Sequence, residues 1–139
     1  MHNSLAISSI YVFTAYQGIS QWHQNVQRIM ARETRTLGNR RREWGEGAMK
    51  ITELLNSPVQ GTSADITKKA LSILHERSKG NGIRIIGCIH DEIIIEAPVA
   101  ETDAAAQILR ESMIDAGKVF LKDVPVVVEV SVADNWYEK

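Results

Sequence analysis

Two runs rich in β-branched residues, separated by three ionisable residues, constrain the fold of this chain more than any other feature. The runs cover 83–89 and 93–97, and His90-Asp91-Glu92 lies between them. Their composition and close spacing predict an antiparallel hairpin. Hairpins normally turn on Asn-Gly or glycine-rich pairs, whereas this turn would hold two adjacent carboxylates on a stiff support.

The acidic turn predicts a metal site. Mg²⁺ prefers oxygen ligands and is usually held by one or two carboxylates together with substrate phosphates. Asp91 and Glu92 are therefore candidate metal ligands, and His90 lies beside them. The residues alone also allow a solvated acidic turn in which His90 is an ordinary surface residue.

Helical periodicity surrounds the predicted hairpin. Apolar residues recur at steps of three and four in four segments, 4–34, 48–55, 62–78 and 101–117. We expect the first helix to break near Gly18 and the second to stop before Pro58, because the residue before a proline disfavours helix. Thr62 or Ser63 would then cap the third helix.

The remaining segments complete an α+β fold. Valines at every second position of 126–132 predict a strand that pairs with the hairpin, giving a small antiparallel sheet packed against helices. Residues 35–47 predict a loop or hairpin around Gly38-Asn39. Repeats and linkers are absent, so we expect one unit.

Aromatic and cysteine residues add expectations about burial. Phe13, Tyr16 and Trp22 share a stripe and are expected in the core. The single cysteine, Cys88, has apolar neighbours and is expected to be a buried, inert thiol of a cytoplasmic protein. The chain lacks the features of a signal peptide, and no apolar run approaches the ~18 residues that span a bilayer, so we expect no membrane contact.

Charge is unevenly distributed although the formal net charge is only −1. Residues 1–80 hold 11 Lys and Arg against 6 Asp and Glu, and residues 81–139 hold 5 against 11. A basic half beside an acidic half is typical of a polyanion-binding surface next to a cation site. It is equally compatible with ordinary solvated faces.

Two motifs in a fixed order point to a known family. Segment 56–65 reads Asn-Ser-Pro-Val-Gln-Gly-Thr-Ser-Ala-Asp, and 89–92 reads Ile-His-Asp-Glu. Together they resemble the signature of family A (polymerase I-like) DNA polymerases. Segment 36–42 is similar to the family's Thr-Leu-x-Gly-Arg-Arg-Arg turn, with Asn39 in place of the usual glycine, and 133–136 resembles its terminal Trp motif. The resemblance covers nearly the whole chain and suggests a phage or plasmid type.

The resemblance implies a fold and roles for residues. Residues 1–139 would form one partial palm domain, with an N-terminal helical segment (1–34), a basic turn (35–47) and a palm core (48–139) that carries the motif C hairpin. Asp91 would bind two catalytic metals with a second aspartate from motif A. Glu92 would lie beside this site and His90 near the primer end.

The resemblance also implies contacts with DNA. Gln60 and Asn56 would touch the minor groove, where every base pair presents acceptors in a nearly degenerate pattern; the alternative is that they cap the turn before a helix. Arg40, Arg41 and Arg42 would neutralise phosphates of the template–primer duplex, although a solvated charge run is the commoner meaning of such a cluster.

The sequence departs from the family in ways that limit its expected activity. It has no counterpart of motif A or of motif B, which handles the incoming dNTP, and Thr52 stands where an arginine is often found. We therefore expect Mg²⁺ to bind usefully only in a completed site, and we predict that the chain alone does not extend a primer.

Several interpretations of the chain remain open. It could be one subunit of a split DNA-directed DNA polymerase that pairs with an upstream fragment, a remnant of a truncated gene, or a non-catalytic module that binds duplex DNA. A metal-dependent hydrolase is the weakest alternative, since the sequence offers no second ligand cluster. We also expect a homo-oligomer that covers apolar patches.

Overall fold

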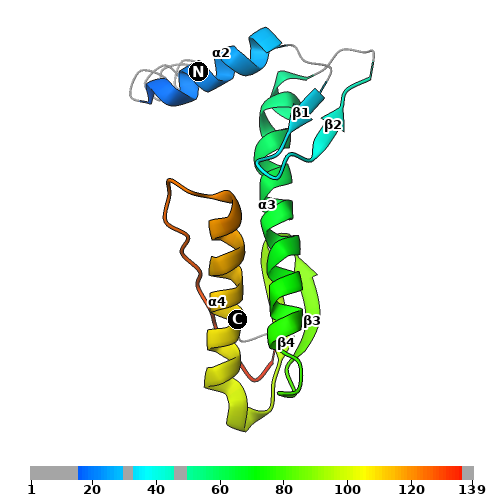
Figure 1. Cartoon of the computed structure of the whole chain (residues 1–139), viewed down its shortest axis with the longest axis vertical. Coiled ribbons are helices and arrows are strands. Elements are labelled where there is room, and N and C mark those ends of the chain that lie inside the picture. Colours follow the sequence, from blue (N-terminus) through cyan, green and yellow to red (C-terminus); the bar gives the residue numbers. More distant parts are fainter. Residues whose placement is uncertain (1–15, 30–32, 46–49, 136–139) are drawn as a thin grey trace, which may run out of the picture. The chain divides into compact units, whose positions relative to one another are not determined.

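The computed structural model describes residues 16–29, 33–45 and 50–135 (Figure 1). In chain order its elements are α2 (Gln17–Ile29), β1 (Glu33–Arg35), β2 (Arg41–Glu43), α3 (Ile51–Arg77), β3 (Arg84–Ile89), β4 (Glu92–Glu96), the 3-10 helix η1 (Val99–Glu101) and α4 (Thr102–Phe120). This arrangement confirms the predicted α+β class. None of these described helices has the length and apolar character needed to cross a membrane.

The chain divides into two compact units, Met1–Val59 and Gln60–Lys139. In the first unit, α2 carries apolar residues at helical spacing, but Tyr16 just before it is 63% exposed and Trp22 is 36% exposed. The expectation that these two aromatic residues lie in the core is wrong. Periodicity determines which side chains share a face, whereas burial requires a second element over that face. Phe13, and the part of the predicted helix from 4 to 15, lie outside the described residues.

The first unit also contains an antiparallel hairpin, β1–β2, which confirms one of the two structures predicted for 35–47. Its turn is closed by the amide of Thr36, which donates to the Arg40 carbonyl at 3.1 Å, and by the amide of Asn39, which donates to the Thr36 carbonyl at 2.9 Å. Asn39 has φ +62°. Asparagine is one of the few residues other than glycine that adopt this left-handed conformation readily, so it can replace the glycine of the motif it resembles.

Helix α3 runs through Pro58 without a break, which contradicts the predicted stop before this residue. A proline inside a helix removes one hydrogen bond and costs about 3 kcal/mol. Burial continues on both sides of it, at Leu54 (3% exposed) and Thr62 (8%), and this burial offsets the cost. Thr62 and Ser63 therefore do not cap a helix. Instead the Ser63 carbonyl accepts an interior hydrogen bond from Thr67 Oγ1 at 3.1 Å.

The end of α3 follows the prediction. The Ser78 amide donates to the Leu74 carbonyl at 2.9 Å, and Asn81 Nδ2 donates to the Arg77 carbonyl at 3.1 Å. Gly80 then adopts φ +84°, which is the left-handed conformation that commonly ends a helix. These bonds satisfy carbonyls of the last turn and direct the chain into β3.

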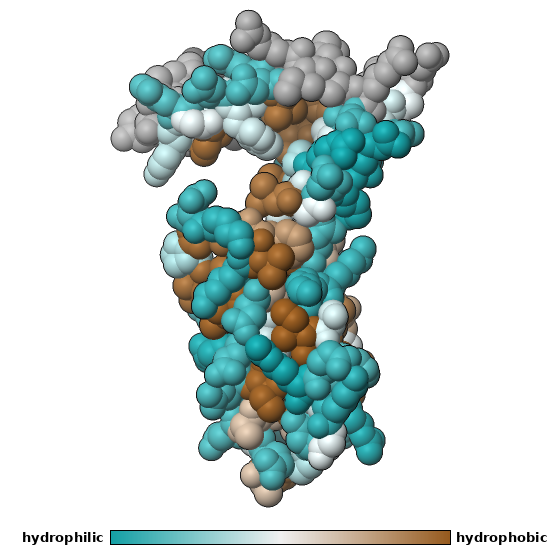
Figure 2. All heavy atoms as spheres, viewed as in Figure 1, coloured by the Kyte–Doolittle hydropathy of each residue, from teal (hydrophilic) through white to brown (hydrophobic). Residues whose placement is uncertain are grey.

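The core of the second unit lies where α3, α4 and β4 meet. Its buried members come from all three elements: Ala70, Leu74, Ile93, Leu109 and Ala116. In Figure 2 apolar residues gather along the face where α4 lies beside α3, with hydrophilic residues around them. An ion pair between Arg77 Nη2 and Asp115 Oδ2, 2.6 Å apart, joins the last turn of α3 to α4 at the edge of this core. The predicted inward face of α4 is confirmed.

The valine-rich segment after α4 forms no strand, and the described sheet has two strands instead of the three predicted. Burial still alternates from 125 to 131, so the segment is extended as expected. It runs back along α4 (Figure 1), where Arg110 Nη1 donates to the Val128 carbonyl at 2.8 Å. Alternation predicts an extended conformation but does not identify the element that the segment contacts.

Candidate active site

The β3–β4 hairpin places His90 and Asp91 in an exposed two-residue turn. The strands pair antiparallel, and the pair closest to the turn is Ile89 with Glu92. The predicted hairpin is confirmed, but Glu92 begins β4 rather than belonging to the turn.

The strands of this hairpin are anchored in the core along their length. Ile93 is 7% exposed, and Ile85 and Ile95, which face each other across the strands, pack against the same apolar cluster. Packing of both strands against the core is expected to limit the movement of the turn. The stiff support that the sequence predicted for the two carboxylates stays a prediction, and this packing favours it.

His90 has φ +55°, a conformation that glycine adopts without strain. Histidine is several-fold enriched there relative to most non-glycine residues, yet the conformation remains uncommon for it. Strained residues of this kind cluster at functional sites. The histidine at the first turn position is therefore a conformational marker that sequence reasoning, which considered only its side chain, missed.

Cys88 is exposed, so the expectation of a buried thiol is wrong. It pairs with the buried Ile93 in the ladder and lies two residues from His90. An extra residue at Ile86 also interrupts the alternation of β3, since Ile85 pairs with Ile95 while Gly87 pairs with Ile94.

The turn offers two carboxylates to a cation. Asp91 and Glu92 are both exposed, and across 16–29, 33–45 and 50–135 no three His, Cys, Asp or Glu side chains form a group that could hold a metal ion. The donor chemistry fits Mg²⁺, which takes one or two carboxylates and completes its shell with water and phosphate oxygens. Asp91 and Glu92 would therefore supply only part of the ligands of such an ion.

The two amide residues predicted to contact DNA both lie on α3. Asn56 and Gln60 are exposed. The alternative role of capping the turn before a helix is wrong, because α3 is continuous from Ile51 to Arg77 and no helix begins near 62.

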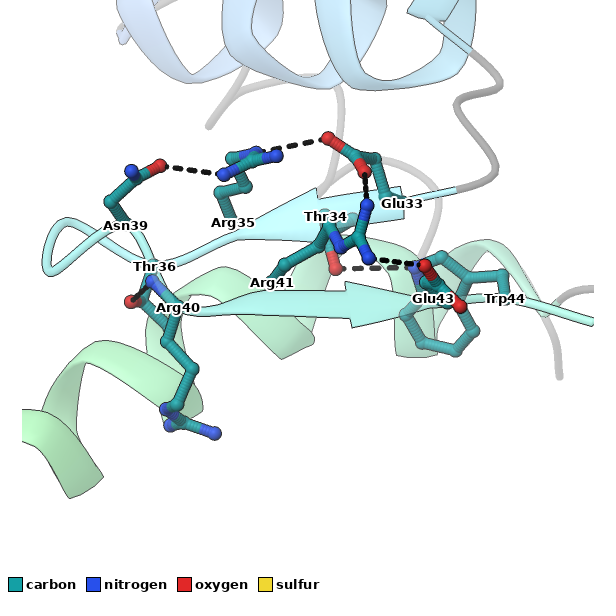
Figure 3. A network of polar contacts seen from close by, with 9 residues as sticks. All are labelled: Glu33, Thr34, Arg35, Thr36, Asn39, Arg40, Arg41, Glu43 and Trp44. Atoms are coloured by element: carbon teal, nitrogen blue, oxygen red, sulfur yellow. Dashed lines mark hydrogen bonds and ion pairs between the residues drawn. The ribbon is translucent and has the colours of Figure 1, made fainter.

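The three consecutive arginines lie in and beside β2, and the structure separates their environments. Arg41 Nη2 is 2.6 Å from Glu43 Oε1, and Arg41 Nη1 is 3.4 Å from Glu33 Oε2. Arg35 Nε lies 2.9 Å from the other oxygen of Glu33. Figure 3 shows this network on β1 and β2.

The network has an electrostatic consequence. A hydrogen bond from Arg35, together with the charges of Arg35 and Arg41, holds the pKa of Glu33 below its usual 4.5. Like charges face each other across the strands, and their repulsion is compensated by an ion pair within each strand and by the diagonal pair of Arg41 with Glu33. The prediction that the three arginines contact phosphates did not consider the two glutamates. Each glutamate lies two residues from an arginine in its strand, and this spacing was the sequence signal that they could form ion pairs.

On the other face of the hairpin, the Arg42 guanidinium lies 4.1 Å from the centre of the Trp44 ring. Trp44 Nε1 donates a 3.1 Å hydrogen bond to Thr34 Oγ1. Among the described residues, no carboxylate pairs with Arg42.

The sequence matches the profile of DNA polymerase family A over residues 6–138. The chain belongs to this family. It is 29% identical over 126 residues to DNA polymerase I of Aquifex aeolicus, covering 89% of this chain and 22% of that protein. It is 35% identical over 118 residues to DNA polymerase I of Chloroflexus aurantiacus, covering 84% of this chain and 12% of that protein.

A solved structure has the same fold over most of this family member. The POL domain of Pol1 from M. smegmatis, in complex with DNA primer-template and dNTP, aligns with a TM-score of 0.68 and 28% identity, covering 75% of this chain and 20% of that one. The chain thus spans about a fifth or less of these relatives and corresponds to part of a family A polymerase. The phage or plasmid type stays a prediction.

Proposed function

We propose that this chain supplies a metal-binding carboxylate turn and part of the duplex-binding surface of a template-dependent DNA polymerase. The observation that supports this most directly is an exposed Asp91 at the turn of a hairpin anchored in the core, in a member of this family. The similar M. smegmatis domain was solved with DNA primer-template and dNTP, which supports the same substrates here.

The proposed reaction is nucleotidyl transfer. The primer 3′-oxygen forms a bond to the α-phosphorus of the dNTP while the bond between that phosphorus and the bridging oxygen breaks, releasing pyrophosphate. Mg²⁺, when bound, would favour loss of the 3′-hydroxyl proton to solvent and would stabilise the charge on the departing oxygen. Asp91 and Glu92 would hold the metal, and His90 would lie near the primer end. A second carboxylate is required from another segment, which the resemblance assigns to motif A.

The remaining candidate residues would hold the duplex. Exposed amides at Asn56 and Gln60 donate to minor-groove acceptors, which lets them sense base-pair geometry without reading sequence. Arg40, Arg41 and Arg42 lie on a hairpin whose charge favours phosphate, a contact that positions DNA without specifying sequence.

Primer extension tests this proposal. The 139-residue chain is incubated with a primer–template, dNTPs and Mg²⁺, alone and with a polypeptide that carries motifs A and B. We expect no extension by the chain alone and extension by the mixture, lost on Asp91→Ala. Robust synthesis by the chain alone, or unchanged synthesis with Asp91→Ala in the mixture, contradicts the proposal.

A non-catalytic duplex-binding module is the second candidate. The exposed Arg41 and Arg42 on β2 support it, since duplex binding through arginines needs no metal site. It predicts duplex affinity that falls steeply with salt, unaltered by Asp91→Ala, and no synthesis in any mixture.

A further inference from the structure

The β1–β2 hairpin has two chemically different faces. Side chains alternate along a strand, and the register pairs Glu33 with Glu43, Thr34 with Arg42, and Arg35 with Arg41. Both glutamates therefore share a face with Arg35 and Arg41, and Thr34 and Arg42 point to the other. The first face carries two positive and two negative charges and is neutral.

On the neutral face, Arg41 has little capacity left for a ligand. Its two terminal nitrogens are taken by Glu43 at 2.6 Å and Glu33 at 3.4 Å. A phosphate that approached Arg41 would also meet both carboxylates, whose repulsion opposes the attraction of the guanidinium.

On the opposite face, the guanidinium of Arg42 lies over the ring of Trp44. It is 4.1 Å from the centre of the ring, and the ring is fixed at its edge by the 3.1 Å bond from Nε1 to Thr34 Oγ1. Thr34 Oγ1 in turn donates to Ser57 Oγ of α3 at 3.4 Å. Stacking on a ring leaves the N–H donors at the rim of the guanidinium available.

We infer that Arg42, positioned by Trp44, binds a phosphate of duplex DNA, and that its neighbour Arg41 instead holds the hairpin together. The stack restricts the guanidinium before DNA arrives, so less side-chain entropy is lost on binding. This inference rests on the proposed duplex contact and distinguishes between arginines that the sequence treats alike.

The test uses one substitution at two adjacent positions. The affinity of the 139-residue chain for a fluorescently labelled primer–template is measured by anisotropy between about 50 and 200 mM NaCl, where each phosphate contact contributes about 0.9 to the slope of log K against log salt. Arg42→Gln and Arg41→Gln both remove one positive charge, so their difference isolates direct contact from net charge. Circular dichroism confirms that each variant folds.

We expect Arg42→Gln to weaken binding about tenfold at low salt, as for loss of a charge-assisted bond, and to reduce the slope by about 0.9. Arg41→Gln should weaken binding about twofold, the effect of one remote charge. Arg42→Lys and Trp44→Leu keep the charge and lose the stack, so the slope should stay while affinity falls about threefold.

The outcomes separate the inference from the proposal beneath it. Equal losses for Arg41→Gln and Arg42→Gln would show that the cluster acts through net charge, which overturns the inference and leaves duplex binding intact. Full affinity in Trp44→Leu would overturn the positioning role of the ring. No binding of the duplex by the unaltered chain would overturn both the inference and the proposed duplex contact.

Discussion

A Cβ atom on Gly117 would stand 2.7 Å from Cγ1 of Val126. The glycine lies inside α4, where it costs about 1 kcal/mol relative to alanine. Its presence is explained by the extended segment after α4, which brings Val126 directly onto the helix backbone.

Gly117→Ala should lower the free energy of unfolding by about 1 kcal/mol, because overpacking costs about 1–3 kcal/mol and the gain in helix propensity returns about 1. Urea unfolding measures the change. Adding Val126→Ala should make Gly117→Ala less costly by creating room. Gly18→Ala is the matched control: it lies in α2 with nothing within 4 Å of its added methyl group and should not destabilise. Equal effects at both glycines would contradict this explanation.

The left-handed backbone of His90 predicts an unusual order of substitutions. His90→Gly should leave stability equal or raise it slightly, because glycine adopts φ +55° freely. His90→Val should lower stability by about 1–2 kcal/mol, since a β-branched residue is strained in this region. Thermal unfolding monitored by circular dichroism gives the order. A valine variant as stable as the glycine variant would show that the turn adopts a different conformation.

The pKa of Glu33 should depend on Arg35. Because hydrogen bonding from Arg35 lowers this pKa in the folded chain, the stabilisation is present at neutral pH, above the unfolded-state pKa, and is lost as the pH falls through the folded pKa, below 4.5. Carboxyl titration by NMR should show the Glu33 pKa rising in Arg35→Gln.

Glu76 provides the control for this titration, since its pKa is lowered by Lys79 instead. Arg35→Gln should leave Glu76 unchanged, and Lys79→Gln should raise the Glu76 pKa alone. An unchanged Glu33 pKa in Arg35→Gln would show that the network is not formed in solution.

The chain should self-associate through exposed apolar residues near the turn formed by His90 and Asp91. Ile86 is 59% exposed and Ile89 is 44% exposed on the same short hairpin. Burial of such residues in a second copy is favourable, so light scattering should report a dimer or larger species, reduced by Ile86→Ser. Val99→Ser is the control, because this residue is 92% exposed on η1. A clean monomer at high concentration contradicts the prediction.

Local sequence signals predicted the elements whose partners are close in the chain. The β3–β4 hairpin, the end of α3 near 78 and the helix α4 follow from β-branched runs and helical periodicity. Each of these features is determined by residues only a few positions apart, so a single sequence contains the information.

The errors concern competition between local preference and packing. Pro58 disfavours helix locally. However, Leu54, Thr62, Ala70 and Leu74, which are buried, recur at helical spacing on both sides of it. This spacing in the sequence could have revealed one long helix. The segment 126–132 alternates like a strand, yet no pattern within it indicated that it would lie on α4. For the site, the acidic turn was predictable, whereas the division of roles between Arg41 and Arg42 required the register of β1 and β2.

The anchoring of the β3–β4 hairpin links the position of the proposed metal ligand Asp91 to core packing. Asp91 is only two residues from Ile93 in the chain. Ile93 belongs to the same core cluster as Leu74 and Ala116, and Ile95 packs against this cluster. Substitutions that loosen the interior would therefore displace the carboxylate by a fraction of an ångström while the chain still counts as folded. The metal would then be held less precisely at temperatures below the unfolding transition. The melting temperature would therefore overstate the temperature range over which the proposed site binds metal.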